Sequence, residues 1–396
     1  MNQQPPVEWL ASRVPQVPGQ LAERMCVSAA SLQRMGGGVS GSPLWRGRTR
    51  HASEDDRVFK AHLLERFTGP RIEAIHRLSN LGAGMVELQV IDPASRLPTA
   101  WIDGAWVWQC QRWVDGCPLD ASASIDPIVA GVRMIGRFQA SVAAVPCDFG
   151  TGNMPLAALS RVPTAMDDRI DRLVKVLADP AAITRAAMQL RAVAGLPPDL
   201  ADPLGRVVRD ARRHWQRLLC ELREVKNAMP SRRQWCLRDV HRENMLFETP
   251  GFETLGLETL DDAQATIRDP KATIIDPDGC RWDDPAIDIA RWVGSFAITD
   301  LGIDAWWPAV LAGWRDAWPS NVQATGSRRR ISCLMETTAW MSLLFWLDQV
   351  PVPAGVSSGL PAGASSSTPT TAAANYQSKI DFWARRVLGF VRLAKH

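Results

Sequence analysis

Short runs rich in apolar and aromatic residues recur along the first 114 positions between glycine-rich or polar turns, and such runs are typical of β-strands. Such runs lie at residues 31–35, 44–49, 57–64 and 105–116. The first two flank a glycine-rich stretch at 36–42, which predicts a strand, a tight turn and a second strand. Residues 70–81 instead place Ile72, Ile75 and Leu78 at helical spacing, which predicts a helix between the later strands.

Beyond residue 114 the apolar positions recur at steps of three and four, which is typical of helices. This spacing covers 126–145 and most of 154–228, and it resumes at Asp284, where Pro285 suits a first helical turn. A last helix is predicted over 378–393. Its apolar face would contain Ile380, Trp383, Val387 and Phe390 or Val391. Its opposite, polar face would carry Arg385, Arg386 and Arg392.

The chain has 396 residues, enough for two lobes with separate cores. We place an N-terminal lobe over 1–114 and a C-terminal lobe over 115–396. Residues 351–375 consist mainly of Pro, Ala, Gly, Ser and Thr, so we expect a mobile loop there rather than packed structure. Residues 248–271 are expected to extend a hairpin.

The composition of the chain indicates which classes of partner and which cellular compartment to expect. Hydrophobic residues make up 46% of the chain, charged residues 22%, and the net charge is +3, which does not indicate a nucleic-acid partner. Eight cysteines occur without a CxxC or another metal-ligand pattern, so we expect reduced, buried thiols. The N-terminus lacks a basic, apolar leader, and the longest apolar stretch is too short to span a bilayer. We therefore expect a cytoplasmic protein without a membrane partner.

The most informative chemistry lies in two segments, Leu-Arg-Asp-Val-His-Arg-Glu-Asn around Asp239 and Ile-Ile-Asp-Pro-Asp-Gly around Asp276. An Asp followed at the fifth position by Asn, here Asn244, is typical of kinase catalytic loops, and a metal-binding Asp follows on the next strand. Taken singly, such an Asp more often caps a turn or a helix. Phosphoryl transfer needs one carboxylate at the acceptor hydroxyl and separate oxygen ligands for magnesium, which explains the spacing.

A third block, Asp-Pro-Ala-Ile-Asp-Ile-Ala at 284–290, completes a pattern. Together the three blocks resemble the aminoglycoside phosphotransferase family, whose motifs are HGDxHxxN, then IDW or IDF, then DPAxDLA. The matching residues are Asp239, Asn244, Asp276 and Asp288. The resemblance implies an α+β, bilobal protein-kinase-like fold, with a small antiparallel β-sheet lobe that holds one helix and a larger, mainly helical lobe. It also implies ATP and Mg²⁺ as cofactors and a hydroxylated small molecule as acceptor.

By the same resemblance, Asp239 would orient the acceptor hydroxyl and take its proton, while Asn244 and Asp276 would hold Mg²⁺. Asp288 would accept backbone amide hydrogen bonds from the catalytic loop and order it without touching substrate. Asp278 could join the metal, but we favour a turn residue.

Two segments of the sequence offer candidates for the nucleotide side of the site. Gly37, Gly38 and Ser40 would let backbone amides approach phosphates, although such a cluster is also common in a plain hairpin. Lys60 stands where the kinase fold keeps its phosphate-pairing lysine, and a solvated lysine is the equal alternative. Its partner would be a glutamate, Glu73 on the helix or Glu65.

The run at 105–116 resembles the hinge strand of the family. In such a fold it would place 111–114, including Gln111 and Trp113, against the adenine, whereas an ordinary edge strand is the alternative.

Leu237 and Arg238 depart from the His-Gly of the family text. Leu237 would brace the loop by packing, and a catalytically weak or inactive nucleotide-binding protein is therefore the alternative function. His241, inside the loop, could contact the acceptor or simply be solvated. No activation segment follows, which argues against a protein kinase. Residues 151–235 carry 15 Lys or Arg against 9 Asp or Glu, which favours a neutral or anionic acceptor over a polycationic antibiotic unless these charges are merely solvated.

Overall fold

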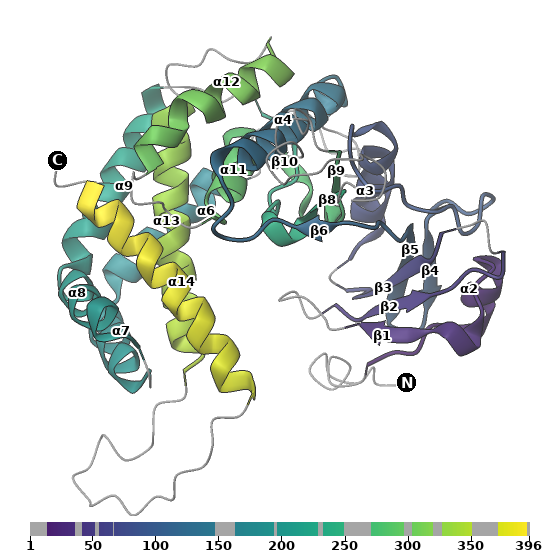
Figure 1. Cartoon of the computed structure of the whole chain (residues 1–396), viewed down its shortest axis with the longest axis horizontal. Coiled ribbons are helices and arrows are strands. Elements are labelled where there is room, and N and C mark those ends of the chain that lie inside the picture. The colour runs from purple at the N-terminus through teal and green to yellow at the C-terminus, as the bar shows by residue number, and fades with distance from the viewer. Residues whose placement is uncertain are drawn as a thin grey trace, which may run out of the picture. The chain divides into compact units, whose positions relative to one another are not determined.

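The computed structural model describes residues 14–35, 42–51, 55–65, 67–146, 163–193, 196–228, 233–248, 271–296, 303–319, 327–350 and 371–393. These form two compact units, shown in Figure 1. The first contains the described residues within 1–119, 137–162 and 243–281, and the second contains the others. The first unit takes residues from both sides of residue 114, since the hairpin that follows Glu243 groups with the N-terminal strands. The lobes 1–114 and 115–396 stay a prediction.

In the first unit, the described strands build a five-stranded antiparallel sheet in the order β1-β2-β3-β5-β4. Its strands are β1 (Gln33–Met35), β2 (Leu44–Gly47), β3 (Arg57–Leu63), β4 (Ala100–Asp103) and β5 (Trp106–Arg112). The predicted strands are confirmed, and β1 pairs with β2, with Met35 opposite Leu44. The glycine-rich turn predicted between them lies mostly outside the described residues. Within β3, Lys60 lies opposite Leu44 on one side and Gln109 on the other.

The two faces of this sheet have different tasks. Phe59 and Ala61 of β3 and Trp108 and Cys110 of β5 are buried together with Leu21 of the short helix α2 (Gly19–Arg24). Because side chains alternate along a strand, the intervening positions of β3 and β5 point to the opposite face. That face carries polar side chains at 60, 62, 109 and 111.

Helix α3 (Gly69–Leu81) follows β3 and buries Ile72, Ile75 and Leu78, as the spacing predicted. Three short strands, β6 (Cys117–Pro118), β8 (Met245–Phe247) and β9 (Ala272–Ile274), pair antiparallel within the described part of this unit. The helical turn η3 (Pro277–Gly279) comes directly after β9, and Met85 forms a parallel bridge with Ile274. The insertion between β8 and β9 lies mostly outside the described residues.

The second unit is mainly helical (Figure 1). Its described elements are α6 (Ala165–Ala178), α7 (Ala182–Ala192), α8 (Pro198–Arg209), α9 (Ala211–Ala228), β7 (Gln234–Cys236), η2 (Arg242–Asn244, which ends in the first unit), β10 (Arg281–Asp283), α11 (Ala286–Val293), η4 (Ile303–Trp306), α12 (Trp307–Ala317), α13 (Ser327–Asp348) and α14 (Thr371–Leu393). Helix α4 (Ile125–Val142) is continuous across the division between the units. Strand β7 pairs with β10.

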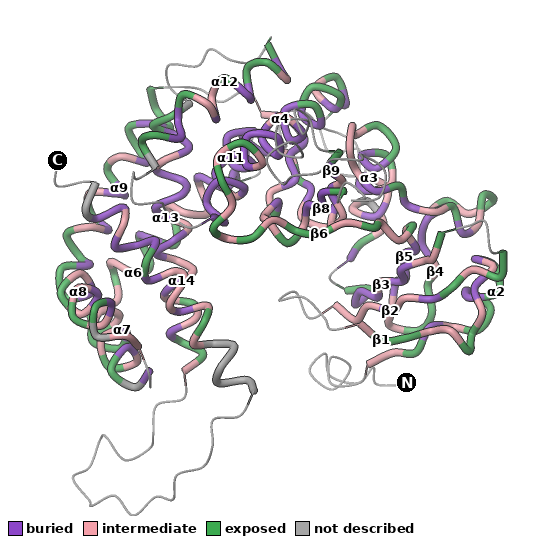
Figure 2. Tube along the Cα trace, in the orientation of Figure 1, coloured by how far each residue is buried: buried purple, intermediate pink, exposed green. Residues whose placement is uncertain are grey.

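Helix α13 contacts α9, α11 and α14, so it lies at the centre of the helical core. Trp215 of α9 and Trp340 of α13 meet edge to face with ring centroids 5.7 Å apart. Helix α11 is buried along most of its length, and Asp288 in its first turn is among the buried residues. Figure 2 shows the distribution of buried and exposed residues along the chain. A buried carboxylate at this place needs hydrogen-bond donors, which the loop described below supplies.

The α+β class, with a sheet-rich first unit and a helical second unit, is confirmed. Helix α14 begins at Thr371, so residues 371–375 are helical rather than part of the expected loop, and 351–370 lie outside the described residues. The expected exposure of Arg386 is wrong: it is 2% exposed and donates to the carbonyl of Phe296, because α14 packs against both α8 and α13.

The described cysteines are free. Their expected burial holds for Cys110, Cys236, Cys280 and Cys333, while Cys26 is half-buried. Cys117 and Cys220 are exposed, which corrects that expectation for them. Among the described helices, none combines the length and apolarity that a membrane crossing requires.

Candidate active site

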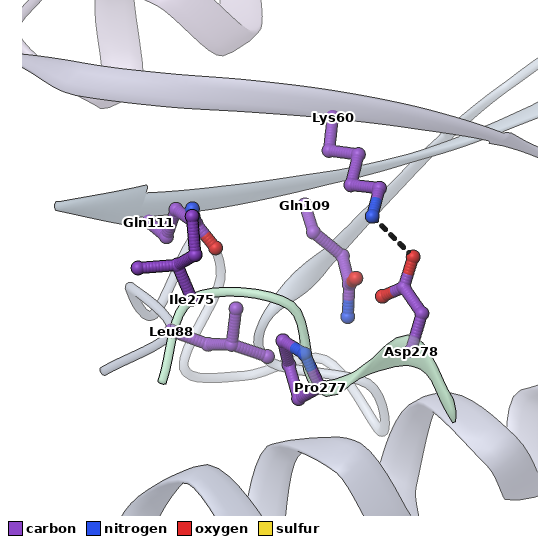
Figure 3. A pocket seen from close by; sticks show the side chains of 7 residues that line it. All are labelled: Lys60, Leu88, Gln109, Gln111, Ile275, Pro277 and Asp278. Carbon is purple, nitrogen blue, oxygen red and sulfur yellow. Dashed lines mark ion pairs between the residues drawn. The ribbon is translucent and has the colours of Figure 1, made fainter. Parts of the chain in front are cut away.

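A pocket opens on the polar face of the first unit's sheet. It is lined by Lys60, Leu88, Gln109, Gln111, Ile275, Pro277 and Asp278 (Figure 3). Strands β3 and β5 supply the lysine and the two glutamines, and the chain after β9 supplies the last three residues. Leu88 reaches this place because it bridges to Gln111. Of the residues predicted from sequence for the nucleotide, the pocket brings together Lys60 and Gln111.

Lys60 is held by two carboxylates. Its Nζ lies 2.9 Å from Asp276 Oδ1 and 2.5 Å from Asp278 Oδ2, and Figure 3 shows the lysine extended toward Asp278. Burial disfavours the charged ammonium, but the nearby charges of Asp278 and Asp276 outweigh it, so the pKa of Lys60 is raised. The lysine therefore stays protonated at neutral pH.

The two aspartates differ from each other. Burial and the charge of Asp278 raise the pKa of Asp276. Burial also opposes ionisation of Asp278, but the charge and hydrogen bond of Lys60, together with His62 and Arg71, outweigh it, and the pKa of Asp278 is lowered. Their side chains keep 27% and 20% exposure, so a ligand can reach both. These two adjacent carboxylates carry two negative charges, and the ammonium of Lys60 neutralises one of them.

Asn244 and Asp276 are brought to the same end of a hairpin. Met245 of β8 lies opposite Ile274 of β9, and the backbone N–H of Ile275 donates to the carbonyl of Asn244 at 3.0 Å. The predicted pair of oxygen ligands thus comes from neighbouring backbone segments. The described residues contain no cluster of three or more His, Cys, Asp or Glu that could hold a metal. Magnesium usually binds one or two carboxylates plus phosphate oxygens and water, so this donor set fits it.

The predicted catalytic loop lies in the second unit and follows β7. Arg238 adopts φ 60°, in the left-handed region that usually favours glycine. Asp288, which is fully buried, accepts the backbone N–H of Leu237 at 3.1 Å and of Arg238 at 2.8 Å. The predicted role of Asp288 toward the loop is confirmed. Leu237 is 1% exposed and packs as expected.

The side chain of Arg238 explains how an arginine tolerates this position. Its Nε lies 3.0 Å from Asp283, which is fully buried, and its Nη2 lies 2.6 Å from Asp168. Asp283 also accepts the backbone N–H of Ala165. Burial raises the pKa of Asp283, and the Arg238 charge counteracts this. The left-handed backbone, which costs about 1–2 kcal/mol for a residue with a Cβ, is offset by these bonds.

Asp239 follows directly and is about half exposed, with its side chain 52% accessible. Its Oδ1 accepts a hydrogen bond from Nη2 of Arg291, a residue of α11. Arg169 lies close enough to both Arg291 and Arg238 for their charges to act on it, and burial lowers its pKa to about 9, helped by the two arginines. The surroundings of Asp239 are therefore basic. His241, in the same loop, is half-buried.

Other predicted residues lie elsewhere. Glu73 does not serve Lys60: its carboxylate lies 3.2 Å from Arg77 on the same helix, while Glu65 is exposed. Trp113 does not line the pocket; the guanidinium of Arg46 stacks over its ring at 3.8 Å. Gly37, Gly38 and Ser40 lie outside the described residues.

Sequence reasoning missed the interactions of Asp278, Arg71 and Arg291. Asp278 was expected to be a turn residue, and its backbone does form η3, but its side chain binds Lys60. Two acids separated by one residue after a strand were the available signal. Nothing in the local sequence indicated which acid Arg291 would meet.

The sheet-rich unit with its lysine pocket and the helical unit with its catalytic-type loop define a protein-kinase-like α+β fold. Solved structures of small-molecule phosphotransferases share it. An aminoglycoside phosphotransferase from Alicyclobacillus acidocaldarius matches with a TM-score of 0.53 and 14% identity over 96% of this chain and 97% of that chain. Amicoumacin kinase, in complex with AMP-PNP, Ca²⁺ and its ligand, matches with a TM-score of 0.52 and 10% identity over 94% and 96%.

Spectinomycin phosphotransferase, in complex with ADP and spectinomycin, matches with a TM-score of 0.51 and 8% identity over 91% of this chain and 93% of that chain. Identities this low establish the shared fold and nothing finer. Neither a protein-family model nor a curated protein sequence matches this chain.

Proposed function

We propose that the protein is an ATP-dependent phosphotransferase that moves the γ-phosphate to a hydroxyl of a small molecule. The observation that carries the proposal is that Lys60 of β3, which lines the pocket, lies 2.9 Å from Asp276, with Asn244 at the same hairpin end. A lysine and a metal-binding Asp in contact, beside an Asn, are the parts that phosphoryl transfer requires for charge neutralisation.

ATP would occupy the pocket on the polar face of the sheet. Gln111 would border the base within the pocket, and Trp113, two residues further along the chain, would border it from outside the pocket lining. Lys60 would pair with the phosphates, and Gly37, Gly38 and Ser40 would cover them. The position of Gln111 in the pocket supports this arrangement. The complexes of similar folds with ADP and AMP-PNP support a nucleotide ligand in general.

Asn244 and Asp276 would hold Mg²⁺. Bound there, the ion would supply neutralisation of the phosphate charge. The raised pKa of Asp276, caused by burial and by the charge of Asp278, supports a cation at this place because a positive ion would relieve that repulsion.

Asp239 would orient the acceptor hydroxyl and receive its proton. Its exposure suits a residue that must meet a substrate, and Asp288 fixes the backbone from which it projects. The acceptor would be a small hydroxylated compound. Because Arg291 binds Asp239 and Arg169 lies close enough to act on Arg291, a neutral or anionic acceptor fits better than a polycation.

A second candidate is a nucleotide-binding protein that transfers phosphate weakly or not at all. The specific observation in its favour is that Arg291 already binds Asp239 Oδ1, which would have to stay compatible with an incoming hydroxyl.

Substituting Asp239→Ala tests the choice. We expect ATP and Mg²⁺ to stabilise wild type and Asp239→Ala alike against thermal unfolding. Acceptor-dependent ATP consumption should fall by about 10²–10⁴-fold in the variant. It is measured over a panel of hydroxylated metabolites and aminoglycosides. Equal turnover in both proteins would reject Asp239 as the catalytic residue. Stabilisation by nucleotide without turnover of any acceptor would favour the second candidate.

A further inference from the structure

Among the described residues of the first unit, Lys60 pairs with Asp276 and Asp278 rather than with the glutamate of helix α3. In the kinase scheme a glutamate of this helix pairs with the phosphate-binding lysine. Here the candidate glutamate of α3, Glu73, pairs with Arg77 one turn away and is partly exposed. Lys60 is instead 13% exposed and is surrounded by carboxylates from the chain after β9.

Of the two carboxylates, Asp278 is better placed to hold the lysine during function. A cation bound to Asp276 would repel the ammonium of Lys60 and take up the lone pairs that now accept from it. Asp278 Oδ2 lies closer to Nζ, at 2.5 Å compared with 2.9 Å for Asp276 Oδ1. The contact with Asp278 would therefore remain when the contact with Asp276 weakens.

The surroundings of Asp278 fix its position. Arg71 of α3 donates to its backbone carbonyl, and its own N–H donates to Asp276 Oδ1 at 3.3 Å. His62 Nε2 lies 3.5 Å from Oδ2, but burial lowers the pKa of His62 to about 4, so this ring is neutral at pH 7. The charge of Asp278 is thus directed mainly at Lys60, and α3 reaches the site through Arg71.

We propose that Asp278 is the positioning residue that holds Lys60 for the nucleotide phosphates, in the place of a helix glutamate, and that Arg71 is the helix residue that supports it. The inference rests on the proposed function, since it assigns the lysine to a nucleotide.

The experiment compares Asp278→Asn with Glu73→Gln, a matched loss of one carboxylate. We expect Asp278→Asn to raise the KM for ATP by about 10-fold to 100-fold, the effect of losing a hydrogen bond between charged groups, with a smaller change in kcat. Glu73→Gln should leave the KM within about twofold of wild type, because its partner is an exposed arginine. Asp278→Glu, which restores the charge, should recover most of the affinity.

A double-mutant cycle separates positioning from general stability. If Asp278 acts through Lys60, Asp278→Asn should add nothing to the defect of Lys60→Met. Should Asp278→Asn fail to fold, Arg71→Ala takes its place and should raise the KM for ATP in the same direction. A metal role would appear differently, as a higher Mg²⁺ concentration for half-maximal activity at unchanged ATP affinity, and that result overturns the proposal.

The outcomes distinguish this inference from the function on which it rests. A wild-type protein that binds AMP-PNP but transfers no phosphate rejects the transferase function, and the role of Asp278 is then measured as the loss of AMP-PNP affinity in Asp278→Asn. Equal nucleotide affinity in wild type and Asp278→Asn, or a loss confined to Glu73→Gln, rejects Asp278 as the anchor. A wild type that binds no nucleotide rejects both.

Discussion

The acidic residues that contact Lys60 and those that contact Arg238 are all aspartates, but they differ in solvent exposure and in bonding partners. Asp276 and Asp278 retain 27% and 20% exposure and face one lysine between them. Asp283 and Asp288 are fully buried, and their oxygens accept backbone N–H groups and the Arg238 guanidinium. The carboxylate charges of the first pair are accessible to a ligand. The carboxylate oxygens of the second pair are bonded to groups inside the protein.

This difference teaches how an aspartate's role follows from its partners. Carboxylates that repel each other in an accessible pocket are held there by the surrounding fold, and a cation would relieve them. Carboxylates that accept amide hydrogen bonds in a closed core determine the backbone path. Substitutions should therefore change activity in the first pair and stability in the second.

The largest effect is expected for Asp276→Asn. Removing a metal-ligating charge should lower kcat/KM on the order of a thousandfold, the scale of several kcal/mol of lost charge stabilisation. The unfolding temperature should stay equal or rise, because burial and the repulsion from Asp278, which raise the pKa of Asp276, both disfavour its charged form. Steady-state kinetics and thermal unfolding measure the two quantities. A large loss of stability would break the comparison.

Asp288→Asn should show the reverse pattern, with stability lost first. The amide offers one acceptor oxygen, so the N–H of Leu237 or Arg238 would stay buried without an acceptor, at about 3 kcal/mol. Denaturant unfolding gives this value. Asp381→Asn on α14 is the matched control, since its exposed pair with Arg385 should contribute less than about 1 kcal/mol. Equal effects of the two substitutions would contradict the structural role of Asp288.

Arg238→Gly should have a smaller effect because two contributions oppose each other. Glycine relieves the left-handed backbone, but Asp283 would lose the cation that offsets its burial, for a net loss of about 2–3 kcal/mol. Adding Asp283→Asn should restore much of the stability in urea unfolding. A stabilised Arg238→Gly protein would show that backbone strain outweighs the ion pair.

The pH dependence of that variant gives a further check with a definite sign. Burial already raises the pKa of Asp283, and losing Arg238 would raise it more. A raised pKa in the folded state means that stability falls as pH rises through it. Arg238→Gly should therefore recover part of its loss on acidification, in contrast to Arg238→Gly with Asp283→Asn.

The smallest change in stability is expected for Glu336 of α13, which belongs to neither aspartate pair. Burial raises its pKa to about 7 despite its ion pair with Arg217, so the folded protein binds the proton more tightly than the unfolded chain. Its contribution is complete below the ordinary pKa of 4.5 and is lost as pH rises through about 7. We expect wild type to lose about 1–2 kcal/mol between pH 5 and 7 relative to Glu336→Gln. Parallel stability curves for the two proteins would contradict this.

Local patterns were sufficient for some elements and insufficient for others. Short apolar runs bounded by turns located β3 and β5, and helical spacing located α3, because the residues that each element buries lie close together in the sequence. The motif around Asp288 also predicted its bonds to the loop.

Long-range ion pairs could not be predicted in this way. Lys60 and Asp278, or Arg291 and Asp239, meet through the packing of distant segments, and many acids in the chain were equally plausible partners. For the same reason the burial of Arg386 was not predicted. The sequence analysis assigned α14 one apolar face, but the helix packs against both α8 and α13.

The left-handed arginine has a consequence for how mutational scans of this chain would be interpreted. Arg238 adjoins the proposed catalytic residue, and single substitutions there should depress function, so a scan would label it essential. Yet its contacts are Asp168 and Asp283, and the effect of any replacement depends on what occupies those two positions. The apparent importance of position 238 is thus a matter of epistasis, and a pairwise library over 168, 238 and 283 would reveal tolerated combinations that no single-site scan contains.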